Sequence, residues 1–312
     1  MKNLTKPNFW DKKSISLISI LLLPFSLITI IIIFFKRFFS KIKNFEIPII
    51  CVGNIYIGGT GKTPTSIYIA NELLNLGFEP VILRKFYQNH SDEYKQIKNN
   101  FGYLIVKKNR AAGINEAKKR NFKTVILDDG LQDYNIKKNL SIVCFNHNQL
   151  IGNGLIIPSG PLREGLSALK NTDVVIINGN KDHAFEKKIL EINKNIEIYY
   201  SYYEPENINQ FKNQKVLALA GIANPNNFFM LLEKNNLIIE KKIIFPDHYI
   251  FDKEELKKII EEAKEKNLKI IMTEKDFFKV SDFGFTELNY IKVSLTIHNK
   301  EKLICRIKKI YD

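Results

Sequence analysis

From residue 47 onward, short apolar runs alternate along the chain with stretches of helical periodicity. Six apolar runs predict strands: Ile47–Val52, Val81–Leu83, Tyr103–Val106, Thr124–Leu127, Leu140–Phe145 and Val174–Ile177. Three stretches between them predict helices: Thr63–Leu76, Arg110–Arg120 and Arg163–Lys170. Continuous apolar strands that alternate with helices are typical of a parallel sheet covered on both faces. The pattern therefore predicts an α/β fold.

A second alternating set begins near Lys215. It predicts strands at Val216–Ala220, Leu237–Ile244 and Lys269–Met272, and helices at Asn226–Lys234 and Lys253–Lys266. A charged, Asn-rich stretch, Asn180–Asn195, and a Tyr-rich run, Ile196–Tyr203, separate the two sets. We therefore expect two α/β domains, at residues 45–200 and 201–312, behind an N-terminal segment of residues 1–44.

The N-terminal segment contains an apolar run. Residues Ser14 to Phe35 carry no charge, and at ~1.5 Å per residue a helix of this length crosses a ~30 Å hydrocarbon core. Pro24 interrupts the run, and cations flank it on both sides, so the positive-inside rule gives no orientation. Two membrane placements stay open, a spanning helix and a kinked segment lying in one leaflet. A buried core helix is the alternative that needs no membrane.

Composition narrows the classes of partner. The net charge is +14, which favours an anionic partner such as a membrane surface with anionic lipids. No nucleic acid is expected, because the basic residues are dispersed and no recognition motif occurs. The three cysteines form no disulfide or zinc pattern, which favours a reduced, cytosolic setting for the body of the protein. Cations that follow the apolar run would attract lipid headgroups at about 1 kcal/mol each: Lys36, Arg37, Lys41 and Lys43.

The sharpest motif joins the first predicted strand to the first predicted helix. It reads Gly58-Gly59-Thr60-Gly61-Lys62-Thr63-Pro64, and it follows the order of a P-loop except that Tyr56 takes the place of the first glycine. Glycines allow backbone N–H groups to point at phosphate oxygens, and a helix N-terminus adds positive potential. We therefore predict nucleotide binding by Gly58, Gly59, Thr60, Gly61, Lys62 and Thr63, with Lys62 at the β- and γ-phosphates and Thr63 at Mg²⁺. An ordinary glycine-rich turn is the alternative.

A second half of a nucleotide site follows the strand Thr124–Leu127. Asp128 and Asp129 stand where a Walker-B carboxylate is expected, and we assign Asp129 to the metal, although the sequence leaves the choice between the two open. A guanine-specific protein is disfavoured, because no Asn-Lys-x-Asp motif occurs.

These residues resemble the tetraacyldisaccharide 4'-kinases, the lipid A 4'-kinases of Gram-negative bacteria. The resemblance covers nearly the whole chain and rests on the P-loop and on motifs in matching order: Asp128-Asp129-Gly130-Leu131-Gln132, Pro158-Ser159-Gly160-Pro161-Leu162-Arg163-Glu164, Ala220-Gly221-Ile222-Ala223-Asn224-Pro225, Phe245-Pro246-Asp247-His248 and Thr273-Glu274-Lys275-Asp276. Three segments depart from the family pattern: Arg84-Lys85-Phe86-Tyr87 lacks a glycine, Ser91-Asp92-Glu93-Tyr94 replaces Gly-Asp-Glu-Pro, and Asp133 stands where the family has histidine.

The resemblance implies a first domain that is RecA-like and an active site between the two domains. It implies transfer of the ATP γ-phosphate, with Mg²⁺, to the 4'-hydroxyl of a lipid A disaccharide 1-phosphate precursor at the inner (cytoplasmic) membrane, with the catalytic body facing the cytoplasm. It also implies that Asp92, paired with His248, accepts the acceptor proton.

We add Glu164 as a further metal contact and Arg163 as a contact to substrate phosphate. A loop carboxylate, a packing histidine and a helix-capping arginine are the structural alternatives for Asp92, His248 and Arg163. A P-loop kinase of another small molecule and a membrane-bound ATPase remain alternative functions.

Overall fold

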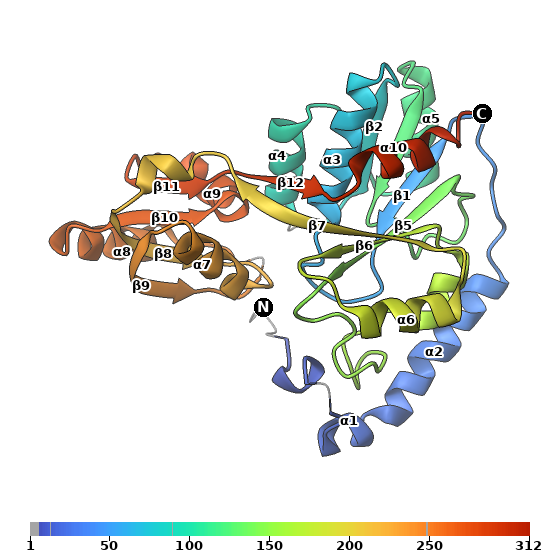
Figure 1. The fold of residues 1–312 in the computed structure, drawn as a ribbon, viewed down its shortest axis with the longest axis horizontal. Helices are drawn as coiled ribbons and strands as arrows, with labels where there is room; N and C mark the ends of the chain where they lie inside the picture. The colour runs from blue at the N-terminus through green and yellow to red at the C-terminus, as the bar shows by residue number, and fades with distance from the viewer. Residues whose placement is uncertain (1–5, 13, 89, 248) are drawn as a thin grey trace. The chain divides into compact units, whose positions relative to one another are not determined.

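The computed structural model describes residues 6–12, 14–88, 90–247 and 249–312 (Figure 1). These residues form two compact units, which are described in turn. The larger unit contains Lys6–Phe86, Phe101–Tyr202 and Leu295–Asp312, and the smaller contains Tyr87–Asn100 and Tyr203–Ser294. The division differs from the expected contiguous domains in two segments. Residues 87–100 join the smaller unit, and residues 295–312 return to the larger one.

The larger unit is built on an eight-stranded sheet with the order β12-β7-β6-β5-β1-β4-β2-β3. The strands are β1 (Ile49–Gly53), β2 (Pro80–Lys85), β3 (Leu104–Lys107), β4 (Thr124–Asp128), β5 (Leu140–Asn146), β6 (Val174–Asn178), β7 (Glu197–Pro205) and β12 (Val293–Ile297). From β7 to β3 every neighbouring pair is parallel. The predicted parallel α/β architecture is therefore confirmed for this unit.

Helices cover both faces of this sheet. α5 (Arg110–Lys119) and α6 (His183–Ile192) pack on one face through Ile114, Phe185 and Ile189. α3 (Lys62–Asn75) lies on the other face, where Thr65 contacts Cys144 of β5 with 3.6 Å between oxygen and sulfur. α10 (Lys300–Lys308) lies beside α3, joined by an ion pair between Lys300 and Glu72. The carboxyl ends of the strands are left accessible to connecting loops, which is where ligands bind in such sheets.

Two local predictions in this unit were wrong. The helix expected at Arg163–Lys170 is an irregular segment followed by a 3-10 helix, η2 (Leu166–Asn171). The charged stretch Asn180–Asn195, expected to be a connection, contains α6, because Phe185 and Ile189 lie one turn apart and bury themselves in the core.

The smaller unit is a four-stranded parallel sheet with the order β11-β10-β8-β9. Its strands are β8 (Lys215–Ala220), β9 (Ile238–Ile244), β10 (Lys269–Thr273) and β11 (Leu288–Ile291). α7 (Pro225–Lys234) covers one face through Phe228 and Phe229. α8 (Lys253–Glu265) and α9 (Glu274–Val280) cover the other face. α4 (Ser91–Asn100) is tied to α9 by Asn100, whose amide donates to both Glu274 oxygens at 3.3 Å. Short 3-10 turns complete the described elements: η1 (Asn8–Trp10), η3 (Ile208–Phe211) and η4 (Ser281–Phe283).

The apolar N-terminal run forms two helices, α1 (Leu17–Leu21) and α2 (Leu23–Phe38). Ser16 caps α1 by accepting a hydrogen bond from the Ser19 N–H, and Pro24 lies in the first turn of α2, where a helix needs no donor. The spanning helix, one of the two membrane placements left open by the sequence, is therefore not found, because the chain is divided at Leu22. In the parts of the chain that the structure describes, no helix combines the length and apolar character needed to cross a bilayer.

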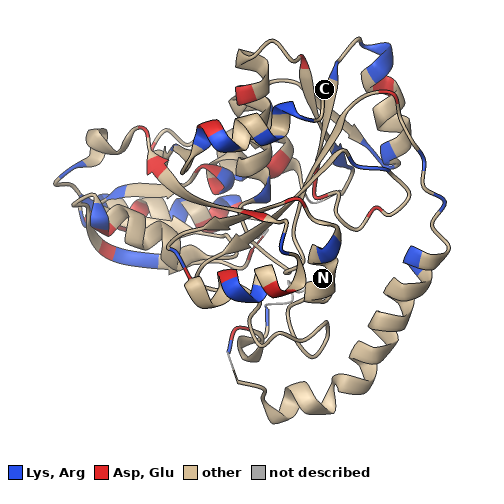
Figure 2. Cartoon of the chain, turned by 45° about the vertical axis from the view of Figure 1, so that its right-hand side comes forward, with Lys and Arg blue, Asp and Glu red and all other residues tan. Residues whose placement is uncertain are grey.

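The burial pattern of these two helices is inverted. Ser19 is the buried residue of α1 and Ser26 that of α2, while most of the large apolar side chains are exposed. Figure 2 shows α2 as an uncharged helix except for the basic residues near its C-terminal end. The buried-core alternative is therefore wrong. The exposed apolar side chains are Ile15, Leu17, Ile18, Ile20, Leu21, Leu23, Phe25, Leu27, Ile28, Ile30, Ile31, Ile32, Phe34, Phe35, Phe38 and Phe39.

Candidate phosphate-binding site

The predicted phosphate loop lies between β1 and α3. Gly58 and Gly61 have positive φ angles of 116° and 89°, values that side chains with a Cβ atom rarely adopt. Gly61 is also the N-cap of α3, so the free N–H groups of a 14-residue helix lie next to the loop. The buried Asn54 amide braces the loop by donating to the Thr60 hydroxyl at 2.9 Å and to the Gly58 carbonyl at 3.3 Å. This local geometry is that of an anion-binding loop.

Asp128, the last residue of β4, binds the start of α3. It accepts hydrogen bonds from the Thr63 hydroxyl and the Ser66 hydroxyl, both at 3.0 Å. Arg84, at the end of β2, forms an ion pair with the same carboxylate and donates to the Thr63 oxygen at 3.0 Å. Because β4 lies between β1 and β2 in the sheet, the carboxylate, the hydroxyl and the guanidinium meet at one edge. The structure thus places Asp128, rather than Asp129, against the predicted metal-binding Thr63.

Asp129 has a different set of partners. Its φ of 56° turns the chain at the end of β4, and its Oδ1 lies 3.7 Å from the Lys62 Nζ and 2.8 Å from an Nη atom of Arg163. Arg110 donates to the Asp129 carbonyl at 2.6 Å. Burial by itself would raise the pKa of Asp129. Attraction by the surrounding cations, first Lys62 and then Arg163, outweighs burial and lowers this pKa to about 2.

Positive charge is in excess around the loop. Lys62, Arg84, Arg110 and Arg163 are four cations against the two carboxylates of Asp128 and Asp129. Asp133, which lies 3.5 Å from Arg110, still leaves one positive charge unbalanced. A site with an excess of positive charge attracts a polyphosphate.

Mg²⁺ fits the same residues. In proteins it is ordinarily held by one or two protein groups together with phosphate oxygens and water. Thr63 and Asp128 supply a hydroxyl and a carboxylate in direct contact, with Asp129 beside Lys62. No group of three or more His, Cys, Asp or Glu side chains placed to hold a metal ion occurs among the described residues.

Glu164, the third residue predicted at the metal, has another ionic partner. Its side chain is 2% exposed and pairs with Arg37 at the end of α2. The Arg37 guanidinium also lies 5.0 Å from the centre of the Tyr134 ring. The structure therefore brings Thr63, Lys62, Asp129 and Arg163 together, and it gives Glu164 a partner from the N-terminal segment.

Asp92, predicted as the base, lies in the first turn of α4 in the smaller unit. It is 2% exposed, and its Oδ2 is 3.8 Å from the Nζ of Lys275. Lys275 also lies 3.0 Å from Asp247 and 4.0 Å from Glu93. Burial would lower the pKa of Lys275, but the charges of Asp247, Glu93 and Asp92 outweigh it and raise that pKa. His248, the predicted partner of Asp92, lies outside the described residues.

Two residues of the Thr273-Glu274-Lys275-Asp276 motif make separate sets of contacts in the structure. Lys275 joins the acidic cluster around Asp92, a role that sequence reasoning missed although the motif itself was visible. Asp276 is fully buried and accepts from the Gly221 N–H at 2.7 Å and from the Thr273 hydroxyl at 2.7 Å. It therefore fixes the turn after β8. Arg84, Arg110 and Arg37 were also missed, because their partners are distant in sequence.

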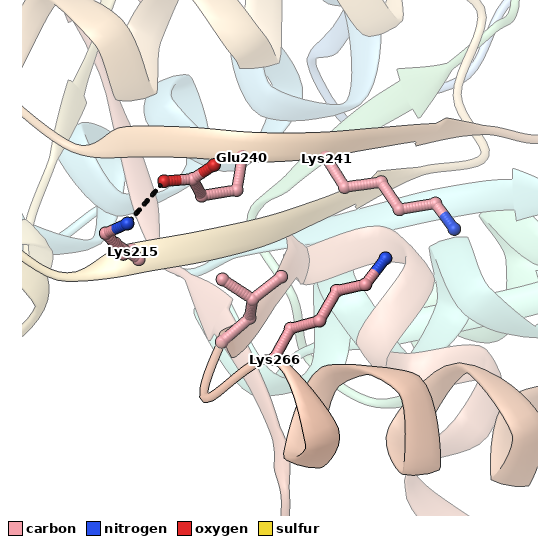
Figure 3. A pocket seen from close by; sticks show the side chains of 5 residues that line it. Lys215, Glu240, Lys241 and Lys266 are labelled. Atoms are coloured by element: carbon pink, nitrogen blue, oxygen red, sulfur yellow. Dashed lines mark ion pairs between the residues drawn. The ribbon is translucent and has the colours of Figure 1, made fainter.

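A hollow elsewhere in the smaller unit is lined by charged residues (Figure 3). Lys215 pairs with Glu240 at 2.9 Å, and Lys241 and Lys266 both pair with Glu262, at 2.6 and 2.8 Å. Each of these lysines already pairs with a glutamate, so we assign no function to the hollow.

Known proteins are similar to this sequence over nearly its full length. The family model described as tetraacyldisaccharide-1-P 4'-kinase matches residues 18–312. A protein named tetraacyldisaccharide 4'-kinase from Pelagibacter ubique (strain HTCC1062) is 43% identical over 310 residues, which cover 98% of each chain. One of the same name from Rickettsia bellii (strain OSU 85-389) is 31% identical over 325 residues, which cover 99% of each chain.

A solved structure shares the fold. It is LpxK from Aquifex aeolicus, described as an "apo" form in complex with ATP. The TM-score is 0.73 at 23% sequence identity, and the match covers 95% of this chain and all of that one. The similarity extends over both compact units, so the fold of each is shared with a solved structure.

Proposed function

Because this chain belongs to the tetraacyldisaccharide-1-P 4'-kinase family, we propose that it transfers the γ-phosphate of ATP to the 4'-hydroxyl of a tetraacyldisaccharide 1-phosphate in lipid A biosynthesis. The observation that carries the proposal is the glycine loop capping α3, with Lys62 and Thr63 against the paired carboxylates of β4. A P-loop kinase of a soluble small molecule and a membrane-bound ATPase would share this loop. Neither accounts for the family match over residues 18–312.

The residues of the larger unit hold and neutralise phosphate. The N–H groups at the start of α3 and the Lys62 ammonium bind phosphate oxygens, while Arg163 lies close enough to Asp129 to reach the same anion. Thr63 with Asp128 and Asp129 would hold Mg²⁺, which when bound neutralises charge on the phosphates. Phosphoryl transfer depends mainly on such positioning and neutralisation.

Proton removal from the acceptor is assigned to the smaller unit. Asp92 is buried beside Lys275, and a positioned carboxylate base accelerates hydroxyl attack by typically ~10²–10⁴-fold. We assign it the acceptor proton, with His248 as its partner. Lys275 holds Asp92, Glu93 and Asp247 together, and so it maintains the geometry of the base.

We further propose that α1 and α2 lie on the inner membrane, with the catalytic body in the cytoplasm. The support is the exposed apolar surface of both helices, which is far larger than the isolated apolar side chains of an ordinary surface. Lys36, Lys41 and Lys43 follow that surface and would lie at anionic headgroups. The acyl chains of the acceptor can then stay in the bilayer during the reaction.

The test is direct. The full chain is incubated with ATP, Mg²⁺ and vesicles containing the disaccharide monophosphate, and the lipid is analysed by mass spectrometry for one added phosphate at the 4'-position. We expect product with the natural chain and at least a ~100-fold lower rate with Lys62→Met, because the lysine neutralises the transferring phosphate. Lys108→Met, at an exposed lysine outside the site, is the matched control.

Two results would contradict the proposal. Folded protein that hydrolyses ATP without phosphorylating the lipid would support the ATPase alternative. If Lys62→Met and Lys108→Met phosphorylate the lipid at the same rate, the reaction does not depend on the lysine of the glycine loop.

A further inference from the structure

The N-terminal arm, residues 6–12 and 14–39, is bound by polar contacts to the loop 150–164. Ser26 of α2 donates a hydrogen bond to the Ile156 carbonyl at 2.8 Å and lies 2.7 Å from the Ser159 hydroxyl. Asn153 donates to the Ser19 hydroxyl at 3.2 Å. Both serines are buried, whereas the apolar neighbours on the same helices are exposed. The arm therefore turns its polar residues toward the protein and docks in a defined position.

An ion pair between Arg37 and Glu164 also links the arm to this loop. Glu164 is almost fully buried, and an unpaired carboxylate there would be costly, so its position depends on the guanidinium. The Arg37 guanidinium also makes a cation–π contact with the Tyr134 ring, whose centre lies 5.0 Å away. Burial and then the Glu164 charge raise the pKa of Tyr134 to about 12, so the phenol stays neutral beside the pair.

Glu164 is joined by one peptide bond to a residue of the phosphate site. The Arg163 N–H donates to the Ile55 carbonyl at 2.7 Å, just ahead of the glycine loop, and its guanidinium binds Asp129 at 2.8 Å. A shift of Glu164 therefore moves Arg163. The chain of contacts runs from α2 through this loop to the carboxylate beside Lys62.

A second contact reaches the loop itself. Tyr56, which replaces the first glycine of the P-loop pattern, is buried, and its hydroxyl donates to Asp11 and accepts from Lys6 at 3.1 Å. Asp11 and Lys6 form an ion pair at 2.6 Å. Tyr56, the residue that departs from the usual motif, is thus held by two residues of the arm.

We propose that the N-terminal arm is a structural part of the phosphate site and that Arg37 is a positioning residue, which holds Glu164 and thereby sets Arg163 against Asp129. The identity of the bound nucleotide rests on the proposed function, whereas the positioning does not. In this arrangement Arg37 holds Oε2 of Glu164. The helix that is proposed to face the membrane therefore also sets the geometry for phosphate binding.

The experiment compares Arg37→Met with Lys36→Met in the full chain. Both substitutions remove one positive charge from the same end of α2. Lys36, however, is exposed and pairs with no carboxylate among the described residues. Hydrogen exchange, which needs no ligand, is measured at the Arg163 amide, and the Kd for Mg·ATP is measured by calorimetry. We expect Arg37→Met to speed exchange at Arg163 and to weaken Mg·ATP binding at least ~10-fold, and Lys36→Met to change either by less than ~2-fold.

Two further variants separate positioning from loss of folding. Arg37→Lys keeps the charge and should recover part of the affinity. Arg37→Met combined with Glu164→Gln should bind Mg·ATP better than Arg37→Met alone, because a buried amide needs no cation. Circular dichroism and melting temperature show that each variant is folded.

Three outcomes would overturn the proposal. Arg37→Met and Lys36→Met behave alike in folded protein, the double variant binds Mg·ATP no better than Arg37→Met alone, or exchange at Arg163 does not change. Failure of the lipid-kinase assay with normal exchange results would reject only the proposed function, since the exchange readout needs neither ATP nor lipid.

Discussion

At the scale of single residues, the adjacent carboxylates of Asp128 and Asp129 bind different partners. The Asp128 carboxylate binds Thr63, Ser66 and Arg84, which lie at the sheet edge and in the first two turns of α3. Asp129 turns away in the left-handed region and meets Lys62 and Arg163. Asp128 thus fixes the frame of the site, and Asp129 balances the cations that a phosphate would contact.

The lowered pKa of Asp129 makes a pH prediction. Its pKa of about 2 lies below the ordinary 3.8, so the ionised form stabilises the fold. This contribution is fully present above pH ~3.9 and is lost as the pH falls toward ~2. At pH 7, Asp129→Asn should lower the free energy of unfolding by about 2 kcal/mol in urea titrations.

The same titrations provide the check on cause. The difference between the natural chain and Asp129→Asn should stay constant from pH 7 to 5 and shrink below pH ~4. A difference that is the same at pH 3 as at pH 7 would show that the effect does not come from the ionised carboxylate.

At the scale of elements, α4 is held by contacts that its own sequence does not announce. Its first turn carries Asp92 beside Lys275, and its last residue, Asn100, binds Glu274 at the start of α9. The two ends of this short helix are thus fixed by consecutive residues of one motif. This arrangement places the proposed base on a rigid helix rather than on a free loop.

For Glu274 we predict a pH dependence of stability opposite to that of Asp129. Burial raises the pKa of Glu274 above its ordinary value of 4.5, and the hydrogen bond from Asn100 offsets this only in part. The neutral form is therefore favoured by the fold, and its stabilising contribution is lost as the pH rises through the raised pKa. Glu274→Gln should unfold at a higher temperature than the natural chain at pH 7, and the two should converge at pH 4. A lower melting temperature at both pH values would mean that the carboxylate charge itself is needed.

At the scale of the whole molecule, the N-terminal arm has two sides of opposite character. Its outer side is apolar and exposed, and its inner side binds the loop 150–164 and Tyr56. Deleting the arm would therefore disturb phosphate binding as well as any attachment to a membrane. Substitutions confined to the outer side separate the two.

We predict that replacing Phe25, Ile28, Ile32 and Phe35 by serine lowers the rate on vesicle-bound acceptor at least ~10-fold and leaves the Kd for Mg·ATP within ~2-fold. The reason is that membrane attachment of such a helix scales with the apolar area it buries. Sedimentation with anionic vesicles measures attachment in parallel. Met230→Ser with Ile250→Ser, at exposed apolar positions of the smaller unit, is the matched control. If the quadruple variant sediments with vesicles as the natural chain does, α2 does not contribute to membrane attachment.

The sequence by itself determined the features that depend on neighbouring residues. Apolar runs placed most strands of both sheets within one or two residues, because a strand buried on both faces must be apolar throughout. The glycine loop was equally readable, because the positive φ angles at Gly58 and Gly61 favour glycine. The irregular segment after Arg163 escaped prediction, since its backbone is set by bonds to Ile55 and Asp129 rather than by its own periodicity.

Only the tertiary structure decided which distant residues meet. The pairing of Arg37 with Glu164, of Asp92 with Lys275 and of Thr63 with Asp128 rather than Asp129 follows from strand order and from the docking of helices. The same is true of α4, which lies between two strands of the larger sheet in sequence but packs in the smaller unit. Local periodicity records how each segment buries its own apolar face, whereas contacts between segments depend on the fold that brings those faces together.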